Sequence, residues 1–460
     1  MGLLPPCPCY RSSSLCNDHS DPHPSTMNLH LHSSHFSSIS SSASSLSSQS
    51  SLPSVPSLTS QPPRSPPPPM SSAAAAAHHF CVATFKGQSY VSSLALASKF
   101  LLSAYSDGEV RSWSRHPLDD NRQTRIHDCR INDNIVAEAG SAVKCIVAVG
   151  DMLITAHQDH KIRVWKVDDR RGRERDRSAD HHQIYRFEAA LPTLGDRLTR
   201  VFSAKNYVEV RRHKKCSWVH HVDAVSALAL SHDGALLYSI SWDRSLKVWR
   251  TSDFKCLESI NKAHDDAINA VVVSPRPDGL VYTGSADTKI KVWARLQRRP
   301  EGDAHSLVAA LEKHRSAVNA LALSGDGRVL YSGACDRSVL VWEREGNGGG
   351  MADGAAHMVV MGALRGHGDA ILCLAVVCDL VISGSADKTV RVWRRDRGPR
   401  SYSCLAVLVG HTRPVKCVAA TATATTTSGD GDESSRRSYM VYSGGLDCSV
   451  KVWQVWVPPS

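Results

Sequence analysis

One short pattern recurs seven times along the 460-residue chain and constrains its fold more than any other feature. The pattern is a Ser or Thr, an Asp four residues later, and a Trp six residues after the Asp. The seven copies are Ser103/Asp107/Trp113, Thr155/Asp159/Trp165, Ser239/Asp243/Trp249, Thr283/Asp287/Trp293, Ser332/Asp336/Trp342, Ser383/Asp387/Trp393 and Ser443/Asp447/Trp453. Such self-similarity predicts seven copies of one structural unit, since a recurring period marks a repeat architecture.

The residues around each copy predict short antiparallel β-strands. In SGSADKTVRVW (383–393), small residues end one strand, Asp387 lies in a turn, and the residues from Thr389 alternate as in a half-buried strand. Asp suits this turn because its carboxylate accepts nearby backbone N–H groups. Another apolar strand precedes each copy, as at 267–273. Several short strands in a unit of about 40–50 residues are typical of one blade of a β-propeller.

A histidine stands four residues before the first strand in five of the units. These histidines are His221, His264, His314, His367 and His411, whereas the first two units carry Gly87 and Ala139 at this place. With this residue the units resemble WD repeats. The resemblance implies a buried chain of hydrogen bonds in each blade, from Trp to Ser/Thr, His and Asp. We therefore expect an all-β, seven-bladed WD-repeat β-propeller with five complete chains and two incomplete ones.

The same residue types also form the catalytic triads of hydrolases. Seven equivalent, buried copies indicate a structural role instead, because an enzyme needs one accessible site. The sequence contains no phosphate-binding loop, no H-E-x-x-H motif and no Cys/His cluster with zinc spacing. We expect no catalytic residues, no metal and no cofactor, so that any function resides in the surface.

The first 77 residues differ in composition from the rest of the chain. This segment is dominated by serine and ends in the proline run 66–69, and so few aromatic and β-branched residues predict a disordered Ser/Pro-rich tail. With only Arg11 and Arg64 it lacks the basic character of an organelle transit peptide. Acylation of Cys7 and Cys9 stays open as an alternative. The propeller is expected at 78–457, with the strand 80–85 completing the last blade and closing the ring.

Two segments interrupt the repeat period. The first, about 168–212, is strongly charged, and residues 166–215 carry fourteen Lys/Arg and eight Asp/Glu of a chain whose net charge is +10. The second, about 421–438, is polar and is predicted to be a flexible loop. Around the first, LPTLGDRL, NYVEVRRHKK and WVHHVDAVS resemble plant WD-repeat proteins of the Jingubang type. This resemblance runs through the whole propeller and implies a plant regulatory scaffold without enzymatic activity.

Candidate protein-binding residues lie in the turns and loops that the resemblance places around one end of the central channel. Trp242 is a large aromatic residue just before a turn Asp, where the other units carry smaller ones. Two residues after the His come Asp223, Asp266 and Asp369, replaced by Ser316 and Arg413 in the other two units. Three carboxylates at one rim favour a basic peptide. A solvated rim, with Trp242 packed against a neighbouring blade, is the alternative.

We expect a monomeric, non-catalytic scaffold for other proteins, in a signalling or developmental role. The scattered cysteines predict a reducing compartment, the cytoplasm or the nucleus, and no apolar run is long enough to span a membrane. Nucleic-acid contact through Arg211, Arg212, Lys214 and Lys215 ranks lower, because this patch is short and mixed with acids. A substrate adaptor of cullin–RING ligases also ranks lower, because the Trp-Asp-x-Arg motif is missing.

Overall fold

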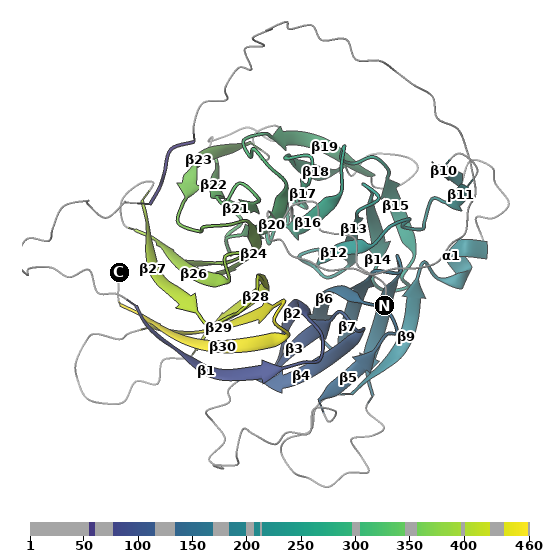
Figure 1. Ribbon diagram of the computed structural model, residues 1–460. Helices are drawn as coiled ribbons and strands as arrows, with labels where there is room; N and C mark the ends of the chain where they lie inside the picture. Colours follow the sequence, from purple (N-terminus) through teal and green to yellow (C-terminus); the bar gives the residue numbers. More distant parts are fainter. Residues whose placement is uncertain are drawn as a thin grey trace, which may run out of the picture. The chain divides into compact units, whose positions relative to one another are not determined.

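The computed structural model describes residues 55–59, 77–115, 134–168, 184–198, 207–211, 214–296, 304–345, 357–396, 401–423 and 437–458. Their strands form seven four-stranded antiparallel sheets and one two-stranded hairpin. The sheets are arranged as the blades of a ring (Figure 1), which confirms the predicted seven-bladed β-propeller. Val55–Ser460 form one compact unit. The predicted disorder of the tail falls on residues outside the described ones, apart from 55–59 and 77.

Each blade is a meander of four strands. The first is β2 (Val91–Ala97), β3 (Phe100–Tyr105), β4 (Glu109–Ser114) and β5 (Ile135–Glu138), and the second is β6 (Val143–Val149), β7 (Met152–His157), β8 (Ile162–Val167) and β9 (Tyr185–Leu191). The third is β12 (Val225–Leu230), β13 (Leu236–Ser241), β14 (Leu246–Arg250) and β15 (Cys256–Ile260). The fourth is β16 (Ile268–Val273), β17 (Val281–Ser285), β18 (Ile290–Leu296) and β19 (Ala304–Leu311).

The remaining blades follow the same order. The fifth is β20 (Val318–Leu323), β21 (Val329–Ala334), β22 (Val339–Arg344) and β23 (Met358–Leu364). The sixth is β24 (Ile371–Val377), β25 (Leu380–Ser385), β26 (Thr389–Arg395) and β27 (Tyr402–Val409). The seventh combines β28 (Val415–Ala422), β29 (Arg437–Gly445) and β30 (Ser449–Val457) with β1 (His78–Lys86) from the other end of the propeller.

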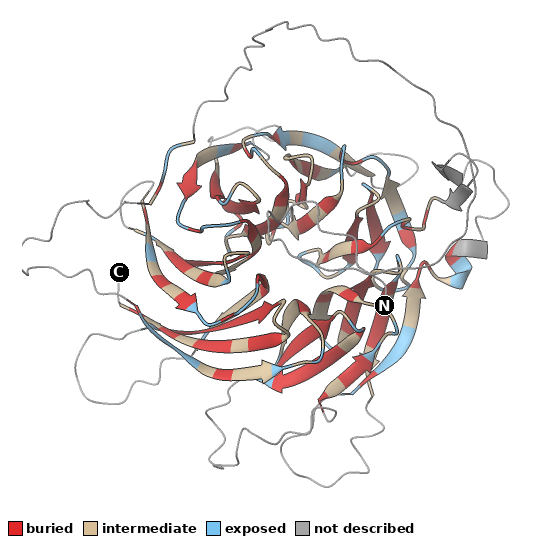
Figure 2. Ribbon diagram, in the orientation of Figure 1, coloured by how far each residue is buried: buried red, intermediate tan, exposed pale blue. Residues whose placement is uncertain are grey.

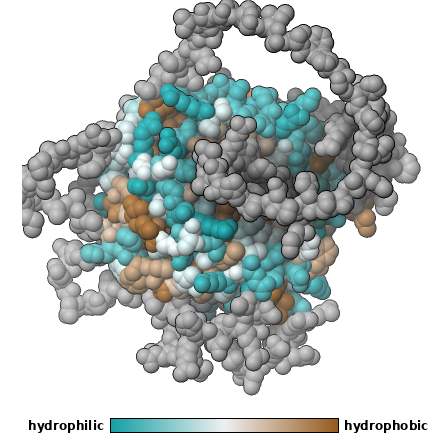
Figure 3. Space-filling view, in the orientation of Figure 1, coloured by the Kyte–Doolittle hydropathy of each residue, from teal (hydrophilic) through white to brown (hydrophobic). Residues whose placement is uncertain are grey.

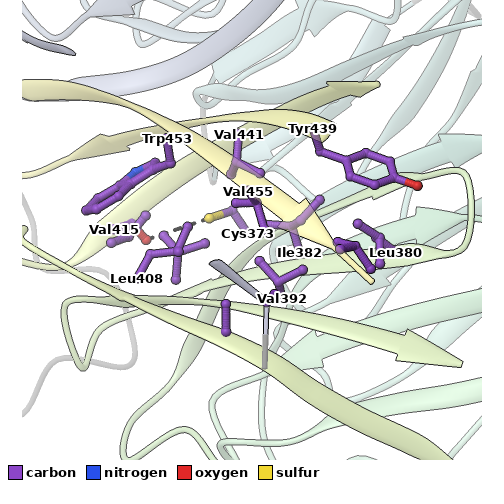
Figure 4. Packing of buried hydrophobic residues seen from close by; sticks show 14 residues of the cluster. Cys373, Leu380, Ile382, Val392, Leu408, Val415, Tyr439, Val441, Trp453 and Val455 are labelled. Carbon is purple, nitrogen blue, oxygen red and sulfur yellow. Dashed lines mark hydrogen bonds between the residues drawn. The ribbon is translucent and has the colours of Figure 1, made fainter. Parts of the chain in front are cut away.

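The core lies between neighbouring blades, where the two faces of each sheet are covered. Strands β13, β21 and β25 are buried along their whole length, whereas outer strands such as β19 and β27 mix buried and exposed residues (Figure 2). Figure 4 shows one such layer, in which Ile382 and Val392 of the sixth blade pack with Val441 and Trp453 of the seventh. Because every blade is sandwiched in this way, the apolar residues of one sheet are buried only when the ring is complete.

The ring is closed by the pairing of β1 with β30, which places the first strand of the propeller at the outer edge of the last blade. The closing strand is longer than the predicted 80–85. The Phe80 ring lies 5.0 Å from the ring of Trp456, and the Phe85 ring stacks on Trp113 of the first blade at 4.4 Å. Strand β1 therefore contacts the last blade and the first.

The expectation of one insertion over about 168–212 is wrong in its middle part. Tyr185–Leu191 form β9, the outer strand of the second blade, which pairs with β8. After it come α1 (Leu194–Leu198) and a hairpin of β10 (Tyr207–Arg211) and β11 (Lys214–Ser217). The Asp196 carboxylate of α1 accepts a hydrogen bond from the Cys256 backbone N–H, which fixes the helix to the third blade.

The second predicted loop, about 421–438, is shorter than expected, because β28 and β29 extend into it. Their pairing continues as far as Ala422 and Tyr439. Residues 424–436, on which the prediction of flexibility falls, are outside the described residues.

Candidate functional site

In the third to seventh blades, Trp, Ser/Thr, His and Asp form one continuous chain of hydrogen bonds. The Trp indole N–H donates to the hydroxyl oxygen at 2.8–2.9 Å, and that oxygen lies 2.7–2.8 Å from His Nε2. His Nδ1 lies 2.7–3.3 Å from the Asp carboxylate. Since a carboxylate only accepts, Nδ1 carries the proton and Nε2 accepts from the hydroxyl. All five histidines are buried.

The tryptophans of these chains differ from the surface candidates, because they lie in the core. The indole N–H groups of Trp249, Trp293 and Trp342 donate to the hydroxyls of Ser239, Thr283 and Ser332, at 2.9, 2.9 and 2.8 Å. The exposed fractions of Trp249, Trp293 and Trp342 are 1%, 5% and 2%, and each belongs to a hydrophobic cluster between blades. Although the sequence places them among the site residues, their burial excludes these three indoles from a binding surface. Trp393 and Trp453 are buried in the same way.

The Asp carboxylate of each chain also fixes two pieces of backbone. In the fourth blade, Asp287 accepts the N–H groups of Asp265, which follows the His, and of Lys289 in the turn. Burial alone would raise the Asp287 pKa, but its hydrogen bonds and the nearby imidazole lower it to about 2. The carboxylate is therefore ionised at neutral pH and holds the histidine loop against the turn at one end of the ring.

The second blade has an imidazole after all, supplied from a different position. His157 lies two residues after Thr155 on β7, and its Nε2 is 2.7 Å from the Thr155 hydroxyl, while Nδ1 faces the Ser141 carbonyl at 3.1 Å. Asp159 instead binds the guanidinium of Arg163. The expectation of an incomplete chain is wrong for the imidazole, because residues i and i+2 of a strand share a face. The link from imidazole to Asp is replaced by an Arg–Asp pair.

The first blade fills the histidine position with a tyrosine ring. A Cβ added to Gly87 would lie 2.2 Å from Cε1 of Tyr105, so glycine leaves room for this ring. Burial raises the pKa of Tyr105 to about 12, which keeps the phenol neutral. The Trp113 indole still donates to Ser103, at 2.7 Å.

The candidate rim residues lie on the loops that these chains hold. Asp223, Asp266 and Asp369 are exposed at equivalent positions of the third, fourth and sixth blades. Each Oδ1 accepts the N–H of the next residue at 2.7 Å, which fixes the side chain on its loop. Arg413 is exposed at the same place in the seventh blade. The structure thus places three carboxylates and one guanidinium at one end of the ring.

Trp242 is half-buried in the turn before Asp243. The Lys144 ammonium of β6 lies 5.1 Å from the centroid of the indole, within cation–π range. The ring thus contacts the second blade and keeps some accessible surface, and its role as an interface anchor stays a prediction.

Comparison with known proteins shows the family. The model described as "WD domain, G-beta repeat" matches residues 79–114, 213–250, 254–294, 305–343, 358–394 and 402–454, more than half of the chain. The chain belongs to the WD40-repeat family. The matched residues leave out β6 to β9, the blade whose imidazole comes from the unusual position. WD40 propellers are typically non-catalytic scaffolds for protein interactions.

Individual relatives match only parts of this WD40 protein. It is 30% identical over 138 residues to the "CCR4-associated factor 4 homolog" of Candida glabrata, covering 29% of this chain and 21% of the relative. It is 28% identical over 232 residues to the "Ribosome biogenesis protein WDR12 homolog" of Chlamydomonas reinhardtii (45% and 50%). It is 30% identical over 192 residues to "Protein ROOT INITIATION DEFECTIVE 3" of Arabidopsis thaliana (38% and 40%). The chain thus spans half or less of these relatives.

Three of the four basic residues proposed for nucleic-acid contact, Arg211, Lys214 and Lys215, belong to the strands of the β10–β11 hairpin of this WD40 protein. In the backbone register of the hairpin, Arg211 stands opposite Lys214, and Lys215 stands opposite Glu209. Arg212 lies outside the described residues. The hairpin follows the second blade, whereas Trp242 and the acidic loops belong to the blades themselves.

Sequence reasoning missed a set of cations under the WD40 rim. The residue two before the Trp is Arg111, Arg163, Lys247, Lys291, Arg391 or Lys451 in six blades and Leu340 in the fifth. Lys247 and Lys291 donate to the backbone carbonyls of Trp218 and Ala263, and so hold the residues before the histidine loops. The recurrence of Lys or Arg at one position was the available signal.

Within the described part of the chain, no group of three or more His, Cys, Asp or Glu could hold a metal ion. The described helix of this WD40 protein is too short to cross a membrane.

Proposed function

We propose that the rim carrying Trp242, Asp223, Asp266 and Asp369 binds a basic segment of a partner protein. The observation that supports this most directly is the repetition of an exposed carboxylate at the same loop position in three blades. Among these loop positions three carboxylates stand against one guanidinium, Arg413. Such an acidic excess on a fixed frame steers an oppositely charged partner and sets its register. Trp242 adds an aromatic surface of the kind that anchors protein interfaces.

Rigidity of the loops supports this assignment. The residue after the His donates its N–H to the turn Asp in each of the third to seventh blades, at 2.7–3.2 Å. The rim carboxylate follows one residue later, with its own backbone hydrogen bond. A loop held this way loses little conformational entropy when a partner binds, which favours affinity.

We further propose a monomeric plant regulator of signalling or development that works in the cytoplasm or the nucleus. Its support is the Jingubang-like sequence between the second and third blades. In the view of Figure 3 the described surface is largely hydrophilic, and apolar side chains lie in separate patches. The nucleic-acid hypothesis ranks lower because the basic patch is short and mixed with acids, and the adaptor hypothesis ranks lower because the Trp-Asp-x-Arg motif is missing.

The test is affinity purification from plant cells with the full chain. The rim variant is Trp242→Ala/Asp266→Lys/Asp369→Lys. Its matched control is Asp233→Lys/Asp326→Lys, because these carboxylates lie in the turns β12–β13 and β20–β21, at the end of the blade strands opposite to the rim loops, and also accept a backbone N–H. We expect the rim variant to lose its specific partners and the control to keep them.

A charge reversal of Arg211, Arg212, Lys214 and Lys215 to Glu separates the hairpin from the rim. Deleting residues 168–212 would not serve this purpose, because the deletion would remove β9 and open the second blade. Loss of partners in the charge reversal, with retention in the rim variant, would assign binding to the hairpin and reject the rim.

A further inference from the structure

A short piece of the N-terminal segment, Val55–Thr59, lies against the outer edge of the propeller. In Figure 1 it is the dark purple trace that runs from β23 to β27. Ser57 forms a parallel bridge with Ala363 of β23, and Thr59 forms one with Tyr402 of β27. Five residues therefore connect the outer strands of two neighbouring blades.

Backbone hydrogen bonds hold this segment on both sides. The Leu58 N–H donates to the Ala363 carbonyl, and the Ala363 N–H donates to the Pro56 carbonyl, both at 2.9 Å. The Tyr402 N–H donates to the Leu58 carbonyl at 3.0 Å. Outer strands carry unpaired backbone groups that accept an added strand. Here the groups of β23 and β27 are paired by the chain's own residues.

Leu58 supplies the side chain that enters the molecule. It is only 6% exposed and belongs to the core cluster formed by Tyr331, Ile371, Trp393 and their neighbours of the fifth and sixth blades. Ser57, the residue before it, is exposed. Val55 packs against the core cluster that includes Met358 and Ala363, and its carbonyl accepts a hydrogen bond from Arg365. One buried leucine between an exposed serine and a half-buried threonine is how an extended peptide binds in a groove.

The fifth blade is adapted to receive this leucine. The residue that pairs with the Val before the motif Trp is Ala189, Ala309, Ala406 or Ala83 in four blades and Glu258 in the third. In the fifth blade it is Gly362, opposite Val341. A Cβ at Gly362 would lie 2.5 Å from Leu58 Cγ and 2.8 Å from the Pro56 carbonyl oxygen. The alanine that four other blades carry would thus close the groove.

We propose that the groove between β23 and β27 is a peptide-docking site separate from the rim, and that Val55–Thr59 of the same chain occupies it. The recognised features are an extended backbone, a leucine side chain over Gly362, and small polar residues on either side. Docking ties the N-terminal segment to the fifth and sixth blades. A partner segment of the same pattern can bind there only by displacing residues 55–59.

The test is hydrogen–deuterium exchange of the full chain, read at the segments 358–364 and 402–409. Leu58→Asp places a charge in the groove, and Ser57→Asp places the same charge on the exposed neighbour as the matched control. Gly362→Ala alters the groove without altering the segment, and alanine is compatible with this strand position in four other blades. In Leu58→Asp and Gly362→Ala we expect the Ala363 and Tyr402 amides to exchange about ten- to a hundredfold faster, as for the loss of one buried leucine.

Unchanged exchange in Leu58→Asp, or in Gly362→Ala alone, would overturn the proposal, because one side of the contact would then be irrelevant. Equal acceleration in Ser57→Asp would also contradict it, since the side chain at 57 does not enter the groove. Protection in the wild type that is independent of protein concentration supports docking within one chain. Protection that disappears on dilution would assign the groove to the segment of a second copy and overturn docking in cis.

Discussion

The Thr155 hydroxyl oxygen lies 2.7 Å from Nε2 of His157, two residues further along the same strand. In the third to seventh blades the same contact joins residues sixteen to thirty-two positions apart. The second blade thus obtains the imidazole from its own strand. Because Asp159 binds Arg163, this histidine has no carboxylate partner in the chain of hydrogen bonds.

This difference predicts a specific pH dependence. Burial lowers the pKa of His157 from 6.5 to about 4. The unfolded chain therefore binds a proton below pH 6.5 that the folded chain refuses, so stability is lost as pH falls from 6.5 towards 4. The loss amounts to about 3 kcal/mol, since one pKa unit corresponds to about 1.4 kcal/mol. Urea unfolding at pH 7 and pH 4.5 should show it in the wild type.

The control for this prediction is His157→Gln, which cannot titrate. Burial also lowers the pKa of His221, but that histidine is present in both proteins. The difference between their pH profiles therefore isolates His157. Identical profiles would contradict a neutral imidazole at this position.

The turn carboxylates should differ in their contribution to stability according to their partners. Asp287 accepts from the His264 imidazole and from two backbone N–H groups, whereas Asp107 accepts from the Glu109 N–H. We expect Asp287→Ala to cost about 2–4 kcal/mol, because it leaves buried donors unpaired, and Asp107→Ala to cost about 1 kcal/mol or less. Thermal unfolding of the two variants tests this, and equal costs would reject the role given to His264.

The Asp287 carboxylate should affect the stability of the fold in a lower pH range than His157 does. Its pKa is about 2, below the ordinary 3.8, so its stabilisation is complete above pH 3.8 and is lost as pH falls towards 2. The Asp287→Ala variant should lose less stability over this range, while the His157 step between pH 6.5 and 4 should remain. The acid loss does not vanish, because the pKa values of the equivalent carboxylates Asp243, Asp336, Asp387 and Asp447 are also lowered.

The sequence predicts most of the fold because the Ser/Thr, Asp and Trp positions are buried and repeated. It predicts the outer strands less well, because only one part of their side chains is buried. Strand β9 lies next to a run of charges and exposes Phe187, so its apolar alternation is weak. The alternation of side chains along a strand predicts that His157 shares a face with Thr155. The fixed position of the other five histidines, before the first strand of each blade, directs the search elsewhere. The docking of Leu58 depends on Gly362, about 300 residues away, and no local pattern reports such a contact.

The tyrosine of the first blade predicts a pair of variants that compensate. Gly87→Ala places a Cβ against the Tyr105 ring and should lower the melting temperature. Tyr105→Ser removes the ring and introduces the residue found at this place in three other blades, as Ser241, Ser285 and Ser385. In the double variant, the cost of Gly87→Ala should largely disappear, which a double-mutant cycle measures. Additive costs would show that the two residues do not share this space.

Closure of the ring through β1 predicts that its loss destabilises blades at both ends of the chain. Without His78–Lys86, β30 has a free edge, and Trp113 loses the stacked Phe85 ring. Free edges of this length pair with other chains, so a protein lacking residues 78–86 should self-associate in sedimentation experiments and melt at a lower temperature. Deletion of residues 1–54, which precede the described segment 55–59 in the sequence, is the control and should leave both properties unchanged. A monomeric variant without 78–86 that melts like the wild type would mean that the remaining three strands of the seventh blade suffice to hold the ring.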